Sequence, residues 1–136
     1  MVAPFLGGNK RNTLYRYTDH MTIFDTSLET FEQDVLAASC ERPVLVDFWA
    51  EWCSPCLVLA PVLEHVMQDL AGALGLAKLE VDHGENMKLA GHYRVRGFPT
   101  VILFDKGQEA GCFSGARSRT QILSFIRDHV DIVDPV

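Results

Sequence analysis

Apolar residues along this chain gather in short runs that are apolar on both faces of an extended segment. In the run at residues 44–50 one face is wholly apolar, and only Asp47 interrupts the other. Strands with two apolar faces are typical of the centre of a sheet that is covered on both sides. The pattern predicts central strands at residues 44–50, 74–82 and 100–105.

The intervening segments carry the 3.6-residue repeat of amphipathic helices. Thr26 and Glu29 have the spacing of a capping box, and Ser118 and Gln121 repeat this signal before the last helical stretch. Pro61 falls inside a predicted helix and should kink it, because proline has no N–H to donate to the preceding turn. The predicted helices follow Thr26 to about Ser39, span residues 55–71 and 85–93, and open at Ser118.

Two further signals complete the predicted sheet. Residues 21–25 have the character of a short first strand. Lys106 and Gly107 have the character of a tight turn, after which residues 111–114 should pair antiparallel with the preceding strand. Alternating strands and helices that end in a hairpin and a last helix indicate a layered α/β domain with a mixed sheet. We assign this domain to residues 21–136.

Residues 1–20 are a separate, locally basic segment. Its apolar run is shorter than the roughly 7–15 residues of a secretory signal core, and its basic residues follow that run instead of preceding it. The cytoplasm is therefore the expected location. His20–Met21 resembles a cloning junction, so Met21 is one candidate for the natural start, and a natural, poorly ordered extension is the alternative.

Composition narrows the class of protein. The 136 residues are 48% hydrophobic and 22% charged, as in an ordinary globular domain. A net charge of −6 argues against a nucleic-acid partner, and no run approaches the roughly 18 apolar residues of a membrane span. Four cysteines are too few for a disulfide framework, so a close pair indicates catalysis or metal binding.

The close pair lies in the stretch DFWAEWCSPC, which places Cys53 just after a predicted strand and Cys56 in the first turn of the next helix. Unpaired N–H groups and the positive end of the helix dipole should stabilise a Cys53 thiolate there and lower its pKa. Pro55 suits this turn, where a missing N–H costs nothing. One thiol can attack a substrate disulfide, and the other can resolve the mixed disulfide.

Two other interpretations of the pair remain open: half of a zinc site, and an inert structural pair. A zinc site needs a second pair of ligands, but Cys40 and Cys112 stand alone and the histidines are scattered. We expect Cys40 and Cys112 to be ordinary, partly buried cysteines and not a second, regulatory pair.

Asp47 is a carboxylate within a strand that is otherwise apolar, so desolvation should raise its pKa. The end of this strand places Asp47 beneath the dithiol, where it is a candidate acceptor for the Cys56 proton; a satisfied buried polar group is the alternative. Lys78, in the neighbouring predicted strand, is a candidate ion partner or a solvated strand-end charge. Trp49 is a candidate supporting residue or plain core.

Pro99, in the stretch RGFPT, stands immediately before a predicted strand. A cis Phe98–Pro99 bond would expose backbone groups to a visiting extended peptide, but about 5–6% of X–Pro bonds are cis and the sequence does not fix the isomer.

Together these elements resemble the thioredoxin family from about Phe24 to Val130. The matching segments, in order, are DFWAEWCSPC, APVLE, AKLEVD, YRVRGFPTVILF, KGQE and SGA. The resemblance implies a central sheet with helices on both faces and a dithiol at the strand-to-helix edge. The implied roles are Cys53 as nucleophile, Cys56 as resolving thiol, Asp47 as buried acid–base and Pro99 as a cis-proline facing the dithiol.

The resemblance also implies partners. Disulfide-containing proteins would be reduced at an apolar docking surface, and a flavin-dependent thioredoxin reductase drawing on NADPH would recharge a chain that binds no cofactor itself. We expect a monomer with no nucleic-acid or membrane partner. The implied docking residues are Trp52, Ser54, Pro55, Gly97, Phe98, Pro99, Gly115 and Ala116, with plain loop packing as the alternative for residues 97–98 and 115–116.

Two residues depart from the commonest family pattern, since Ser54 replaces a glycine and Leu57 a lysine. These changes bear on the redox potential and the choice of partner more than on the reaction, because loop residues and nearby cations tune a thiolate. The leading hypothesis is a thiol–disulfide oxidoreductase that reduces protein disulfides. The alternatives are a less reducing oxidase or isomerase and a binding subunit whose dithiol is incidental.

Overall fold

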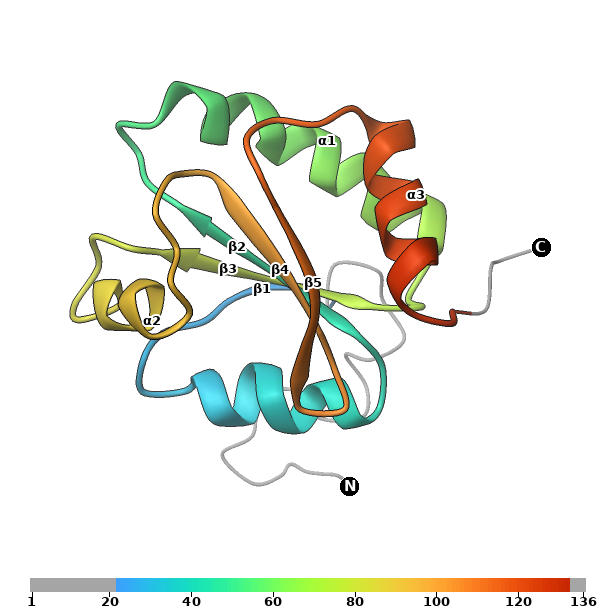
Figure 1. The fold of residues 1–136 in the computed structure, drawn as a ribbon, viewed down its shortest axis with the longest axis horizontal. Helices are drawn as coiled ribbons and strands as arrows, with labels where there is room; N and C mark the ends of the chain where they lie inside the picture. Colours follow the sequence, from blue (N-terminus) through green and yellow to red (C-terminus); the bar gives the residue numbers. More distant parts are fainter. Residues whose placement is uncertain (1–21, 133–136) are drawn as a thin grey trace, which may run out of the picture.

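A five-stranded mixed sheet runs through the molecule (Figure 1). Its strands are β1 (Ile23–Asp25), β2 (Val44–Trp49), β3 (Gly75–Glu80), β4 (Thr100–Asp105) and β5 (Gln108–Ser114), in the order β1-β3-β2-β4-β5. β3 pairs in parallel with both β1 and β2, whereas β4 pairs antiparallel with β2 and β5 antiparallel with β4. The predicted strands and the mixed sheet are therefore confirmed.

The structure, a computed structural model, describes residues 22–132. The segment predicted to precede the domain, residues 1–20, lies outside them, as do Met21 and residues 133–136. In the described part of the chain, no helix is long and apolar enough to cross a membrane.

Helices cover both faces of the sheet (Figure 1). On one face lie α1 (Ser54–Leu70) and α3 (Arg119–His129), whose apolar residues share a core cluster. On the other lie α2 (Met87–His92) and a π-helical segment, η3 (Glu32–Ala37), which continues into the 3₁₀ turn η4 (Ala38–Cys40). The sheet is thus enclosed between two apolar layers.

The alternation predicted along β2 is confirmed for most of the strand. Val46 and Phe48 belong to the cluster beneath η3 and α2, whereas Leu45 belongs to the cluster beneath α1 and α3. Trp49, expected on the face of Leu45, is half-buried and contacts the first cluster instead. It is the last residue of the strand, where alternation no longer fixes the side chain.

The capping box predicted at Thr26 and Glu29 is wrong. The Thr26 hydroxyl donates to Asp34 Oδ2 at 3.1 Å, and the Leu28 N–H donates to Asn86 Oδ1 at 2.8 Å. Residues 28–30 form a turn, and helical structure begins only after it. Tertiary hydrogen bonds have taken the groups that a helix start would use.

The hairpin and the last helix follow their sequence signals. Lys106 and Gly107 connect β4 to β5 with φ angles of 53° and 81°, the left-handed pair that two-residue hairpins favour. At the start of α3 the Ser118 side chain accepts from the Gln121 N–H, and the Gln121 side chain accepts from the Ser118 N–H. The capping box predicted there is confirmed.

We expect Ser118→Ala to lower the free energy of unfolding by about 1 kcal/mol, because the N–H of Gln121 loses its cap. Urea denaturation of the purified variant measures this change. Ser124→Ala, an exposed serine within α3, is the matched control and should change stability much less. Equal effects of the two substitutions would contradict the assignment of the cap.

Candidate active site

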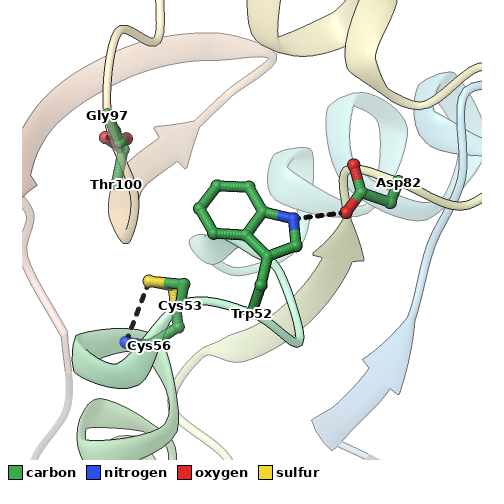
Figure 2. The surroundings of a disulfide bond; sticks show 6 residues. All are labelled: Trp52, Cys53, Cys56, Asp82, Gly97 and Thr100. Carbon is green, nitrogen blue, oxygen red and sulfur yellow. Dashed lines mark hydrogen bonds between the residues drawn. A yellow bond between two sulfur atoms is a disulfide. The ribbon is translucent and has the colours of Figure 1, made fainter.

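Cys53 and Cys56 are joined by a disulfide at the start of α1, with their Cα atoms 5.2 Å apart (Figure 2). Cys53 is the N-cap residue of the helix, and its Sγ accepts a hydrogen bond from the Cys56 N–H at 3.2 Å. Pro55 lies in the first helical turn. The predicted placement is confirmed: the Cys53 sulfur faces the free N–H groups and positive dipole of a helix end, which favour a thiolate.

Asp47 is buried in β2, with only 1% of its surface exposed. Burial raises the pKa of its carboxyl to about 6, and the nearby Lys78 ammonium lowers that pKa by a smaller amount. Its Oδ1 has no hydrogen-bond partner among the described residues. The expected rise is therefore confirmed, and burial is its main cause.

Lys78 lies beside Asp47 in the sheet. Its register partners are Asp25 on β1 and Asp47 on β2, so the three charged residues form a row across parallel strands. The Lys78 Nζ lies 5.2 Å from the centre of the Trp49 ring. Both residues line a cavity of about 450 Å³, to which Glu80 also contributes. Lys78 thus acts electrostatically on Asp47 while bordering a partly polar cavity.

The loop before β4 meets the loop after β5. The Phe98–Pro99 bond is cis, the isomer that the sequence left open. The Pro99 carbonyl accepts from the Gly115 N–H at 2.9 Å, and the Gly97 carbonyl accepts from the Thr100 hydroxyl at 2.6 Å. Gly97 is exposed and Phe98 half-buried. Pro99 itself is buried and joins the two loops, so the accessible part of the surface that they form consists of Gly97, Phe98 and Gly115.

Trp52 joins this surface from the other side. Its indole is 65% exposed, and its ring centre lies 5.9 Å from that of Phe98 in an edge-on arrangement. Its Nε1 donates to Asp82 Oδ2 at 2.6 Å (Figure 2). Sequence reasoning missed Asp82. The available signal was an acidic residue just after a parallel strand, since such strands end at the edge of the sheet where ligands bind.

The remaining predicted docking residues, Ser54, Pro55 and Ala116, are all exposed. Ser54 and Pro55 open α1 beside the disulfide. Ala116 follows Gly115, so it continues the loop that contacts Pro99.

The expectation that Cys40 and Cys112 are partly buried is wrong, because both are exposed. Both are free thiols, as expected for cysteines that do not form a second pair. Cys112 lies on β5, at the edge of the sheet, where a strand has a neighbour on one side only, and Cys40 ends the short η4 turn. Neither position supplies the surrounding contacts that bury a side chain. Within residues 22–132, no group of three His, Cys, Asp or Glu side chains is arranged to hold a metal ion.

A cysteine pair that closes a disulfide within one helical turn, on this fold, defines a thiol–disulfide oxidoreductase. The family model described as thioredoxin matches residues 22–128. The chain belongs to the thioredoxin family. Thioredoxin of Pseudomonas aeruginosa is 47% identical to it over 97 residues, covering 71% of this chain and 86% of the relative.

Two further relatives extend the comparison. Thioredoxin of Acidithiobacillus ferridurans is 43% identical over 104 residues, covering 76% of this chain and 93% of the relative. Probable thioredoxin-2 of Caenorhabditis elegans is 38% identical over 128 residues, covering 93% of this chain and 86% of the relative. The similarity thus spans the whole of the domain.

We expect Asp47→Asn to raise the free energy of unfolding by about 3 kcal/mol above pH 7, because a folded-state pKa of about 6 lies above the unfolded value. Because the folded protein binds the Asp47 proton more tightly than the unfolded chain does, the natural protein gains stability from this proton below the unfolded pKa. The gain is lost as pH rises through about 6. The gain from Asp47→Asn should therefore vanish below about pH 4. Urea denaturation of the oxidised proteins across this range measures it.

Asp69→Asn is a control of opposite sign. A hydrogen bond from Arg119 lowers the pKa of Asp69. Removing the Asp69 carboxylate should therefore reduce the stability of the fold at neutral pH. A pH-independent gain from Asp47→Asn would contradict the desolvation of Asp47.

Replacement of Lys78 by methionine should raise the pKa of Asp47 above about 6, because the ammonium that favours the charged carboxylate is removed. Titration of the Asp47 carboxyl carbon by NMR measures this pKa directly. Lys88→Met is the matched control, since Lys88 pairs with Glu85 at an exposed site. An unchanged or lower pKa in Lys78→Met would show that Lys78 does not act on Asp47.

Proposed function

We propose that this oxidoreductase reduces disulfides in protein substrates, with Cys53 as the attacking thiol. The observation that carries the assignment is the Cys53 sulfur at the N-cap of α1, where it accepts the Cys56 N–H. A thiolate is the nucleophile in disulfide exchange, and a helix N-terminus stabilises the thiolate form. The second thiol, Cys56, is one helical turn away and resolves the intermediate.

The reaction has two exchange steps. The Cys53 thiolate attacks one sulfur of the substrate disulfide, forms a mixed disulfide and releases the other substrate sulfur as a thiolate, which takes up a proton. The Cys56 thiolate then attacks the Cys53 sulfur, which breaks the mixed disulfide and releases the second substrate thiol. The substrate gains two electrons, and the chain is left with the Cys53–Cys56 disulfide seen in the structure.

Asp47 accepts the proton of Cys56 in the second step under this proposal. A carboxyl with a pKa of about 6 is a better proton acceptor near neutral pH than an ordinary aspartate. Its unpartnered Oδ1 supports the same role, because no protein donor competes for that oxygen within residues 22–132. Lys78 and Trp49 are supporting residues that set the charge and polarity on one side of Asp47.

The substrate lies across the continuous surface beside the dithiol. Exposed Trp52 and half-buried Phe98 supply apolar contact, and the residues at Pro99 and Gly115 shape the adjoining loops. Ser54, Pro55, Gly97 and Ala116 complete this surface. A flavin-dependent thioredoxin reductase returns two electrons from NADPH to the disulfide, and the chain itself binds no cofactor. The reaction takes place in the cytoplasm.

A less reducing role, as an oxidase or isomerase, is the second candidate. Ser54 and Leu57 motivate it, because both are exposed beside the dithiol and both depart from the commonest family pattern. The loss of a cation by itself makes the thiolate less stable and the dithiol more reducing, so the measured midpoint potential decides between the two functions.

We expect Cys56→Ser to accumulate mixed disulfides between Cys53 and substrate proteins, because the resolving thiol is absent. Non-reducing electrophoresis and mass spectrometry of adducts captured from a lysate measure the trapped bond. Cys53→Ser should trap far less, and Cys53→Ser/Cys56→Ser should trap none. Equal trapping by Cys53→Ser would assign the attack to Cys56 instead.

The midpoint potential separates the two candidate functions. We expect a value of about −270 mV, as for thioredoxins, and not of about −180 mV, as for protein disulfide isomerase. The fluorescence of Trp49 and Trp52 in a defined dithiol–disulfide buffer reports the closure of the pair. A value in the isomerase range would replace reduction with oxidation or isomerisation as the function.

A further inference from the structure

The solvent-facing side of the first two turns of α1 is apolar, although the outer face of such a helix is normally polar. Leu57 is 53% exposed and Val58 is 62% exposed. Pro61 is also exposed and lies on the same side, three or four residues further along. Glu64 and His65, both exposed, end the apolar strip formed by Leu57, Val58 and Pro61.

This strip begins at the dithiol. The Leu57 N–H donates to the Cys53 carbonyl at 3.2 Å. Leu57 therefore lies one helical turn beyond Cys53, on the same side of the helix. At a rise of about 1.5 Å per residue, Pro61 lies about 12 Å along α1 from Cys53. An extended chain covers that distance with about four residues. A substrate bonded to Cys53 can therefore reach the strip with residues close to its own cysteine.

The charges around the strip favour an apolar occupant. From Glu51 to Glu64 the sequence contains two glutamates and no lysine or arginine. Asp82, which accepts a hydrogen bond from Trp52, adds a third carboxylate next to the residue that precedes Cys53. The exposed cations of the docking surface, Arg96 and Arg117, belong to the loops at Gly97 and Ala116 instead. An acidic segment therefore has no partner along α1, whereas an apolar one removes Leu57 and Val58 from water.

We propose that the apolar strip of α1 binds an apolar segment of protein substrates, located about three or four residues from the cysteine that Cys53 attacks. This inference rests on the proposed reducing function and names its substrate class: disulfides flanked by large aliphatic residues. Docked there, the segment holds the substrate disulfide at Cys53, so the strip raises the rate of the first exchange step through binding.

Two disulfide-linked peptide dimers test the proposal. One carries Leu and Val at three and four residues on either side of a single cysteine, and the other carries Ser at those positions. The readout is the ratio of second-order rate constants with which the two peptides oxidise the pre-reduced protein, measured by quenching with an alkylating agent. We expect the natural chain to prefer the aliphatic peptide by about tenfold, the effect of burying part of two aliphatic side chains.

The variant Leu57→Gln/Val58→Gln should lose most of this preference and bring the ratio close to one. Leu57→Met/Val58→Ile, which keeps the strip apolar, should retain it. Met87→Gln is the matched surface control, because Met87 is 45% exposed but belongs to α2. The ratio is independent of any change in the intrinsic reactivity of Cys53, because both peptides meet the same thiolate.

A natural chain without preference, or a preference retained by Leu57→Gln/Val58→Gln, would overturn the proposal. So would a variant that keeps the peptide ratio but is recharged more slowly by thioredoxin reductase, since the strip would then bind the reductase. A dimer in sedimentation that the double substitution dissolves would assign the strip to a second copy of the chain. If the pre-reduced protein reacts with neither peptide and with no small aryl disulfide, the reducing function itself fails.

Discussion

The enclosure of strand β2 is the constraint on which the rest of the structure depends. It pairs with β3 on one side and β4 on the other, and helices cover both its faces. The chain leaves the carboxyl end of this central strand and turns directly into α1. This turn brings Cys53 to the end of the helix, and the same enclosure removes Asp47 from water.

The site therefore combines two opposite electrostatic environments within a few residues. The helix end at Cys53 favours negative charge, whereas the interior around Asp47 disfavours it. One group is suited to lose its proton and the other to accept one. Asp47 lowers the stability of the fold near neutral pH, and a residue with that effect is explained by the reaction more readily than by packing.

The sequence was most informative where local chemistry and periodicity agreed. The buried strands, the hairpin at Lys106–Gly107, the capping box at Ser118 and the dithiol at a helix start all depend on neighbouring residues, and all are present. The raised pKa of Asp47 could also be predicted, because a carboxylate in a strand that is apolar on both faces is buried away from water.

The failures concern contacts and positions that the local sequence pattern does not specify. Thr26 has a good capping signal, but its hydroxyl donates to Asp34 instead. The N–H of Leu28 donates to Asn86, 58 residues further along the chain. Asp82 reaches Trp52 across 30 residues. The exposure of Cys112 follows from its place on an edge strand, which hydropathy does not reveal. Spacing alone does not encode these tertiary positions.

The sulfur at the start of α1 also makes the surface of this molecule differ between its two redox states. A Cys53 thiolate carries a negative charge that the disulfide lacks, and no lysine or arginine from residue 51 to residue 64 offsets it. A protein that docks beside Trp52 thus meets one electrostatic surface before electron transfer and another after it. One small area can in this way receive a disulfide substrate and an electron donor in turn, and the charge at a single atom distinguishes the two visits.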